Sequence, residues 1–170
     1  MNDLVEKTLQ SLDWPRILDR LSSYAGSGPG RERIQALTFA SSFDEIQRLL
    51  DETTEVRRVI DSGTSVPIGG VREIRPFVGS AQKGEILVGR ELLDIANTLG
   101  ACHQLKRFFA LQAESCPRVQ AVATRLHDLQ ELAALLGNSF DGSGELSTSM
   151  YPALAQLRSR IHALPGRIKD

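Results

Sequence analysis

The side chains best suited to metal binding or nucleophilic catalysis lie apart in this sequence. It contains three histidines, His103, His127 and His162, and two cysteines, Cys102 and Cys116. No pair of histidines has the H-x-x-x-H spacing that places two metal ligands on one helix face. Cys102 and His103 are adjacent, and adjacent helix residues point about 100° apart, so they do not converge on one ion. Neither cysteine has a base partner in its local sequence, and we expect no metal site, no catalytic nucleophile and no enzymatic activity in this chain.

The glycine-rich segments offer little for binding phosphate or calcium. The sequence lacks G-x-x-x-x-G-K-[ST], the pattern of a loop that holds nucleotide phosphates. Gly26, Gly28 and Gly30 surround Pro29 and are typical of a turn between helices. Residues 141–145 read Asp-Gly-Ser-Gly-Glu but lack the further acidic ligands of an EF-hand calcium loop. We therefore expect a turn at each of these places and no cofactor held by this chain.

Four basic residues in the last part of the chain are the candidates for binding an anion. They are Arg158, Arg160, Arg167 and Lys169, and against Asp170 they give this segment a net charge of +3. One interpretation, which we favour, is the outer face of a solvated helix. The other is a set of phosphate contacts, which would raise affinity for nucleic acid without reading its base sequence.

The overall composition indicates an ordinary globular domain. The 170 residues are 41% hydrophobic and 24% charged, with a net charge of -1 and an isoelectric point near 6.3, so no overall positive field attracts nucleic acid. Aromatic residues make up 5%, which argues against a surface that stacks single-stranded bases. Two cysteines are too few for a disulfide framework, and no leader or apolar run of about 20 residues is present. We expect a cytoplasmic protein with free thiols.

Helix caps and helical periodicity recur along the chain, whereas strand patterns are nearly absent. Asp13, Ser27, the S-x-x-E pattern from Ser42, and the Asp128 and Glu131 pair each predict the start of a helix. Gly137-Asn138 predicts the end of the last of these. The spacing of apolar residues predicts helices near 14–25, 29–37, 43–61, 72–82, 90–112, 117–126, 129–136 and 152–160. We expect Pro76 to weaken the helix over 72–82 and Pro165-Gly166 to interrupt the last one.

Two of these helices carry the stripes that we expect to be packed. One has Ile46, Leu49, Leu50, Thr53, Val56 and Ile60 on one face, and the other has Leu92, Ile95, Ala96, Leu99, Cys102, Leu105 and Phe109. On the first helix, Asp51, Glu52 and Glu55 predict a solvated acidic face. Gly84-Glu85-Ile86 and Gly144-Glu145-Leu146 repeat one pattern, either by coincidence or because they form two short paired strands.

The expected fold is therefore all-α. We predict an irregular helical core domain over residues 1–150, with at most one pair of very short strands. Residues 151–170 are predicted to begin a long lever helix.

Several segments of the chain together resemble the N-terminal core region of the second class of bacterial MutS-like proteins. These are Lys7-Thr8-Leu9 with Leu12, the step Ser27-x-x-Gly30-Arg31, the stretch 69–99, and Gly144-Glu145-Leu146 before Tyr151-Pro152. Their order and spacing along nearly the whole chain carry the resemblance. The chain departs from the family at Val88-Gly89-Arg90, where Ser-Pro usually precedes the long helix.

The resemblance implies a role within a longer protein. Such proteins lack mismatch-recognition domains, and their levers lead to a clamp and back to a dimerising ATPase that uses ATP and Mg, often with a C-terminal endonuclease-like domain. They are linked to DNA repair, to suppressing recombination through branched or mismatched DNA, and to rescue of collided ribosomes. This chain would be a core and lever module that couples the ATPase to the clamp. The alternatives are a stand-alone helical interaction module, or direct nucleic-acid binding through the basic segment.

Overall fold

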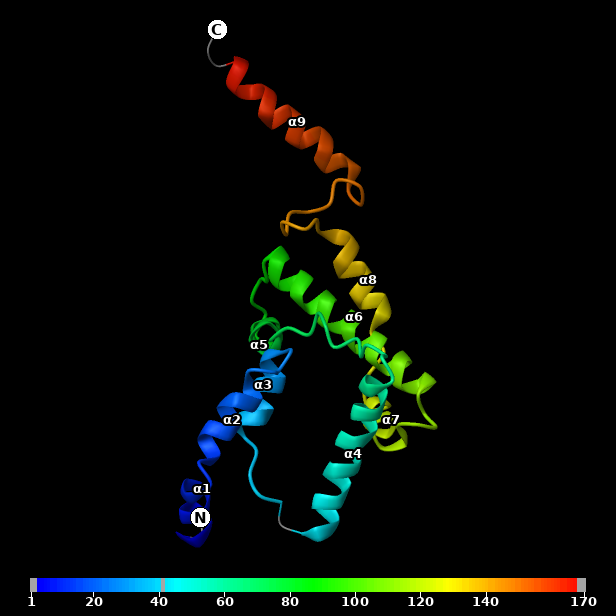
Figure 1. The fold of residues 1–170 in the computed structure, drawn as a ribbon. Coiled ribbons are helices and arrows are strands. Elements are labelled where there is room, and N and C mark those ends of the chain that lie inside the picture. The colour runs from blue at the N-terminus through cyan, green and yellow to red at the C-terminus, as the bar shows by residue number, and fades with distance from the viewer. Residues whose placement is uncertain (1–2, 41, 168–170) are drawn as a thin grey trace. The chain divides into compact units, whose positions relative to one another are not determined.

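The described residues form an all-α fold, as predicted, in which helices are joined by loops and turns. The computed structural model describes residues 3–40 and 42–167, with side chains for 7–40 and 42–161. Within these ranges, one isolated antiparallel bridge between Phe140 and Leu146 is the only β pairing. The helices shown in Figure 1 are α1 Asp3–Ser11, α2 Trp14–Ser22, α3 Gly28–Gln35, α4 Phe43–Asp61, α5 Arg75–Gln82, α6 Gly89–Leu111, α7 Pro117–Ala123, α8 Gln130–Ser139 and α9 Pro152–Arg167.

The helices form two compact units that are interleaved along the chain. The first unit comprises the described residues of Met1–Glu73 and Ala101–Asp128, and the second those of Ile74–Gly100 and Leu129–Asp170. The α6 helix contributes residues to both. The prediction of a core over 1–150 and a lever from 151 stays a prediction.

Two of the predicted serine caps are confirmed. The Ser27 hydroxyl accepts a hydrogen bond from the Gly30 N–H at 3.1 Å, and the Ser42 hydroxyl accepts one from the Glu45 N–H at 3.2 Å. At the start of α6, the Glu91 carboxylate accepts a hydrogen bond from the Val88 N–H at 2.9 Å. That bond is one half of a capping box.

Of the two predicted aspartate caps, Asp13 is confirmed as the residue that precedes α2 but makes no side-chain capping bond, and Asp128 is wrong because Leu129 precedes α8. Asp13 links α1 to α2 with φ 51° and ψ 39°, and its side chain makes no capping bond to α2 because capping requires extended backbone. Its carbonyl instead accepts a bond from the Arg16 N–H. Asp128 lies one residue before Leu129, the residue that precedes α8, and its carboxylate oxygen lies 3.0 Å from Nδ1 of His103. The carboxylate is thus engaged with α6.

Three predicted helix boundaries also move. The helix predicted from residue 72 begins instead at Arg75. Pro76 therefore lies in the first turn of α5, where a proline is tolerated, and not in the interior of the helix. The α8 helix continues to Ser139 because Gly137 does not adopt the positive φ of a helix stop. The α9 backbone stays helical through Pro165 and Gly166 to Arg167, since a proline removes one helical hydrogen bond without always ending the helix.

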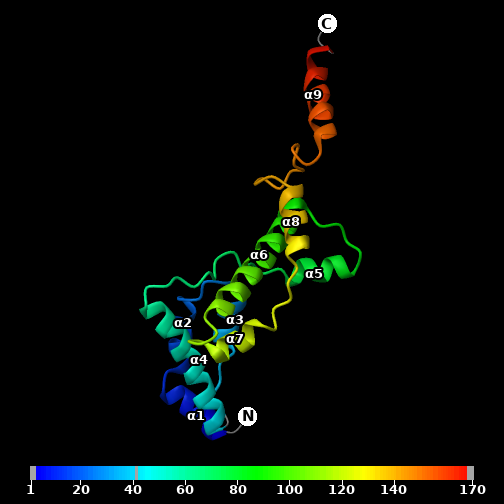
Figure 2. The same ribbon diagram turned by 90° about the vertical axis from the view of Figure 1, so that its right-hand side faces the viewer.

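The predicted packed stripe of α4 is only partly correct. Ile46, Leu49, Leu50 and Ile60 are exposed, and the buried residues of α4 are Glu55 and Val59. The reason is that α7 lies beside α4 in both ribbon views and covers the face next to the apolar stripe (Figures 1 and 2). The core of the first unit consists of Val59, Phe109, Cys116 and Ala123, with Val56, Val66, Leu105, Phe108 and Val119 packed against it. In α6, Ala96 and Phe109 are buried as predicted.

The repeated Gly-Glu pattern does not make paired strands. Ile86 is 97% exposed, and Leu146 is bridged to Phe140 instead. The turn that closes this bridge places Gly144, at φ +87°, against the start of α6. A Cβ added at Gly89 would overlap the Gly144 carbonyl oxygen and lie 2.6 Å from Cδ1 of Phe140. Gly89 is therefore required by close packing in the second unit.

We predict that Gly89→Ala destabilises the protein by about 1–3 kcal/mol, the usual cost of overpacking. The matched control is Gly100→Ala in the same helix, where no described atom lies within 4 Å of the added Cβ. The control should stabilise the protein by about 0.5–1 kcal/mol through helix propensity. Urea unfolding of both variants measures the difference. Equal effects of the two substitutions would contradict the close packing.

Candidate functional site

The structure describes two of the four basic candidates on α9 and does not bring them together. Arg158 donates to the Glu145 carboxylate at 2.8 Å, and Arg160 is exposed. Residues two apart on a helix point about 200° apart, so the two guanidinium groups do not share one phosphate. The Arg167 side chain and Lys169 lie outside the described residues, and phosphate contact stays a prediction.

The segment 141–145 is a turn, as expected. Oδ1 of Asp141 accepts hydrogen bonds from the Ser143 N–H at 2.9 Å, the Ser143 hydroxyl at 2.6 Å and the Glu145 N–H at 3.1 Å. The Ser143 hydroxyl is the largest cause of a lowered pKa of Asp141, followed by the two backbone N–H groups and the charge of Arg158. The Asp141 carboxylate thus stabilises the turn between the bridged residues Phe140 and Leu146.

We predict that this turn contributes stability that is lost in acid. Because the pKa of Asp141 is lower in the folded chain, the stabilisation is complete above the ordinary carboxyl pKa of about 3.9 and disappears as pH falls through the folded value. Asp141→Asn should therefore lower the melting temperature at pH 7, and its difference from the parent chain should shrink in acid. Ser143→Ala should reduce the same pH dependence. If the melting temperatures of Asp141→Asn and of the parent chain changed in parallel with pH, the contribution of the Asp141 carboxylate would be ruled out.

The polar centre of the first unit is a buried carboxylate of α4 at the start of α7. Glu55 is 7% exposed. Its two oxygens accept hydrogen bonds from the Arg118 N–H at 3.1 and 3.2 Å and from the Val119 N–H at 3.0 Å. The N–H groups in the first turn of a helix have no acceptor within that helix, and here the Glu55 carboxylate provides one. The helix dipole also favours a negative charge at this end of α7. Cys116, fully buried, points its thiol at the Glu55 carbonyl at 3.5 Å.

The expectation of a solvated acidic face on α4 is therefore wrong. Asp51 forms an ion pair with Arg118 at 3.0 Å, and Glu52 pairs with Arg48 four residues earlier. With Glu55 buried, all three carboxylates are engaged by named partners. One feature of the sequence could have indicated this contact. Pro117 is typical of the first turn of a helix, and Cys116 before it provides no side-chain cap, so the N–H groups of α7 need an acceptor from elsewhere.

We predict that Glu55→Ala lowers the free energy of unfolding by about 3 kcal/mol, because it leaves buried N–H groups of α7 without an acceptor. Glu55→Gln keeps an acceptor but loses the charge, and should cost about 1–2 kcal/mol. The control Glu52→Ala removes an exposed pair within one helix and should cost at most about 0.5 kcal/mol. Urea unfolding gives all three values. Equal losses for Glu55→Ala and Glu52→Ala would disprove the capping role.

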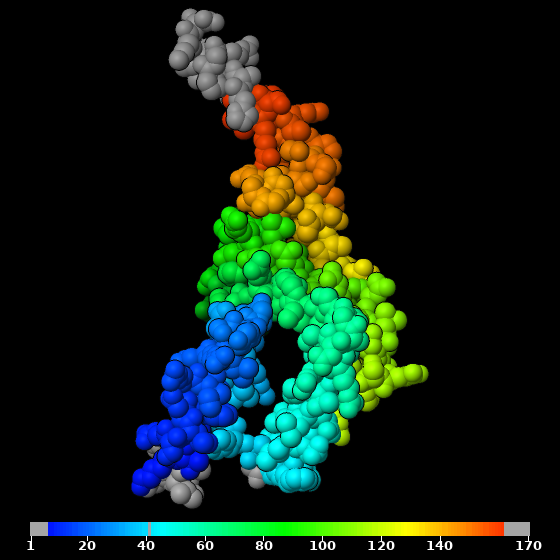
Figure 3. All heavy atoms as spheres, viewed as in Figure 1, coloured from blue at the N-terminus to red at the C-terminus, as the bar shows by residue number. Residues whose placement is uncertain are grey.

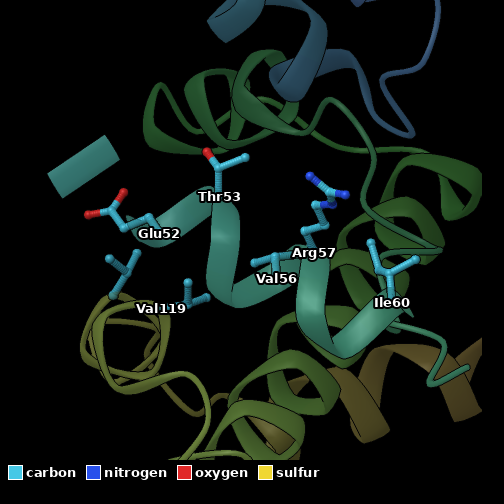
Figure 4. Close-up of a pocket in the computed structure, with 7 residues that line it drawn as sticks. Glu52, Thr53, Val56, Arg57, Ile60 and Val119 are labelled. Carbon is cyan, nitrogen blue, oxygen red and sulfur yellow. The ribbon is translucent and has the colours of Figure 1, made fainter. Parts of the chain in front are cut away.

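An open apolar groove of about 540 Å³ runs between α4 and α7. Figure 4 shows Glu52, Thr53, Val56, Arg57 and Ile60 projecting from α4, with Val119 of α7 opposite. Val122 completes the lining. Two of these residues, Val56 and Val119, also pack against the buried core, so the groove is a continuation of that core. The apolar periodicity of α4 was recognised in the sequence, but the groove itself was missed.

Among the described residues, no three His, Cys, Asp or Glu side chains are placed to hold a metal ion. Burial raises the pKa of the Cys102 thiol, which disfavours the nucleophilic thiolate. His103 lies against Asp128, and the His162 side chain is outside the described part. None of the helices in the described ranges is long and apolar enough to span a membrane.

Comparison with known proteins identifies relatives along nearly the whole chain. No protein-family model matches. The chain is 33% identical over 165 residues to endonuclease MutS2 of Symbiobacterium thermophilum, and 32% identical over 165 residues to that of Pelotomaculum thermopropionicum. It is 30% identical over 170 residues to endonuclease MutS2 of Bacillus cereus. These alignments cover 97–98% of the chain but 21–22% of each relative. The chain thus spans about a fifth of the length of these relatives, and it is related to a segment of proteins named endonuclease MutS2, as its motifs predicted.

Proposed function

We propose that this chain is a non-catalytic core and lever module of a longer MutS-like, DNA-binding ATPase. The observation that carries the proposal is the alignment of 97% of the chain with one fifth of a MutS2 protein. The module would contribute neither ATP-binding nor nuclease residues. ATP, Mg and the endonuclease activity in the relatives' name would belong to the remaining domains, in a cytoplasmic protein that acts as a homodimer.

In this proposal the module transmits motion between the ATPase and the clamp. Transmission requires a body that does not deform, and closely packed interiors transmit strain well. Two features support such stiffness: Glu55 fixes α7 to α4, and Gly89 allows the turn at Gly144 to contact α6. The long protein would act on branched DNA, suppressing recombination in DNA repair, or on collided ribosomes. Phosphate contacts from the basic residues of α9 would be secondary.

The second candidate is a helical protein-interaction module. The exposed apolar face of α4 favours it, because a contiguous apolar surface commonly marks a binding site. The two candidate functions depend on different parts of the chain. An interaction module depends on its exposed surface, whereas a coupling module depends on a rigid interior.

A hybrid protein tests the coupling role. The chain replaces its aligned segment in endonuclease MutS2 of Symbiobacterium thermophilum, and ATP turnover is measured with and without branched DNA. We expect the hybrid to change its turnover on adding DNA. Glu55→Ala in the hybrid should keep basal turnover but reduce the DNA response by about tenfold or more, because α7 is no longer fixed to α4. Thr54→Ala, an exposed neighbour on α4, is the matched control and should leave the response intact.

Two results would contradict the coupling role. One is a full DNA response in the Glu55→Ala hybrid. The other is a full response when a flexible Gly-Ser linker of equal length replaces the chain, because such a linker cannot transmit a rigid-body motion.

A further inference from the structure

The α9 helix meets the rest of the second unit through one face. Among its described side chains, Leu154 and Arg158 are half-buried and the others are exposed. Tyr151 precedes the helix, and with these two residues it has the i, i+3 and i+7 spacing of a single helix face. The described helix pairs with extensive contacts are α1 with α2, α2 with α3, and α4 with α7, so α9 belongs to none of them. The direction of α9 therefore depends on the contacts of this one face.

Two points of contact hold this face, and they lie two helical turns apart. At the first, the Tyr151 hydroxyl lies 3.2 Å from the Ser139 hydroxyl, and the Tyr151 N–H donates to the Ser147 carbonyl at 3.0 Å. At the second, Arg158 donates to the Glu145 carboxylate at 2.8 Å. Seven residues of helix span about 10 Å. A contact at the helix start alone would let α9 pivot, whereas a second contact about 10 Å further on fixes the direction of its axis.

The partners of α9 all belong to one short hairpin, residues 139–147, whose backbone is firmly held. The Asp141 N–H donates to the Glu145 carbonyl at 2.8 Å, and the Ser147 N–H donates to the Ser139 carbonyl at 2.9 Å. The Asp141 carboxylate accepts three further bonds inside the turn. Ser139 is buried at the end of α8. The 139–147 hairpin therefore presents Glu145 to Arg158 from a fixed backbone.

The opposite contact of the 139–147 hairpin is with the start of α6. The Gly144 carbonyl oxygen lies so close to Gly89 that it leaves no room for a Cβ there. A Cβ added at Gly144 would in turn lie 2.9 Å from the backbone nitrogen of Arg90. Figure 3 shows the amber and orange atoms of this part of the chain directly against green atoms. The hairpin thus joins the first turn of α6 to the first two turns of α9.

We propose that Arg158 is a positioning residue, whose ion pair with Glu145 directs α9 from the 139–147 hairpin so that a displacement of α6 is passed to α9. The transmission to α9 rests on the proposed coupling function, whereas the direction of α9 concerns the second unit alone. The side chains of Arg158 and Glu145 are 39% and 69% exposed, so their pair contributes little to the stability of the fold. Its effect is on the direction of a helix that has no other packed neighbour among the described residues.

This role of Arg158 differs from that of a phosphate contact. An arginine that binds phosphate does not need Glu145, and removal of the competing carboxylate would leave it more available. A positioning arginine loses its function when either partner is neutralised. Substitution of Glu145 therefore separates the two roles.

The distance between spin labels on α8 and α9, measured by electron paramagnetic resonance on the whole chain, tests the direction of α9. The labels are placed at the exposed positions Ala134→Cys and Gln156→Cys in a Cys102→Ser background, since Cys116 is fully buried. We expect a narrow distance distribution at low salt. It should widen about twofold in 1 M NaCl, because salt screens a surface ion pair.

Substitution of the two partners should have the same effect as salt. Glu145→Gln and Arg158→Gln should each widen the distribution about twofold, whereas Arg158→Lys keeps the charge and should leave it narrow. The matched control is Arg160→Gln, whose exposed side chain points about 200° away on the same helix. An unchanged distribution in Glu145→Gln would overturn the proposal, as would equal widening in Arg160→Gln.

The hybrid protein described above tests the transmission to α9. Glu145→Gln in the hybrid should keep basal ATP turnover and reduce the response to branched DNA about fivefold. Glu85→Gln, at an exposed carboxylate of the same unit, is the matched control and should keep the full response. A full response in the Glu145→Gln hybrid would overturn transmission through the 139–147 hairpin. A hybrid without substitutions that ignores DNA would instead contradict the coupling function itself, and the spin-label distances would still decide whether Arg158 directs α9.

Discussion

The carboxylate of Glu55 at the start of α7 is the interaction on which the first unit depends. A buried charge is costly unless hydrogen bonds compensate it, and here the compensation comes from the N–H groups of Arg118 and Val119. The α7 helix has seven residues, too few to be stable in isolation. Its position on α4 is thus fixed by the buried contact of Glu55, together with the ion pair between Asp51 and Arg118, and the apolar cluster of Val59 and Phe109 closes around it. Any shift of α7 along α4 would leave both the carboxylate and the helix terminus unpaired.

Local patterns in the sequence predicted the local structure well. The caps at Ser27 and Ser42 join residues three apart, and the end of α4 at Asp61 lies two residues before Gly63, so each could be recognised within a few residues. The contact between Glu55 and Arg118 joins residues 63 apart in sequence, and nothing local distinguishes Glu55 from the neighbouring carboxylates Asp51 and Glu52. The same limit applies to Asp128, whose partner His103 is 25 residues away.

Periodicity showed which residues of α4 are apolar but not which neighbour covers them. The stripe from Ile46 to Ile60 has the regular spacing of a packed face, yet the helix places the adjacent face, with Glu55 and Val59, against α7. An amphipathic pattern therefore identifies a surface that requires a partner without showing whether that partner lies in the same unit. The candidate basic site was similar: its charges were visible in the sequence, while the pairing of Arg158 with Glu145 depends on the turn before α9.

The interleaving of the two units constrains how the chain can be made and divided. The first unit lacks α7 until residue 123 has been synthesised, and the second begins at Ile74, long before the first is complete. A nascent chain released at residue 100 would therefore contain neither unit whole, and it would expose the apolar surface of both. Neither unit can be obtained by shortening the chain from one end.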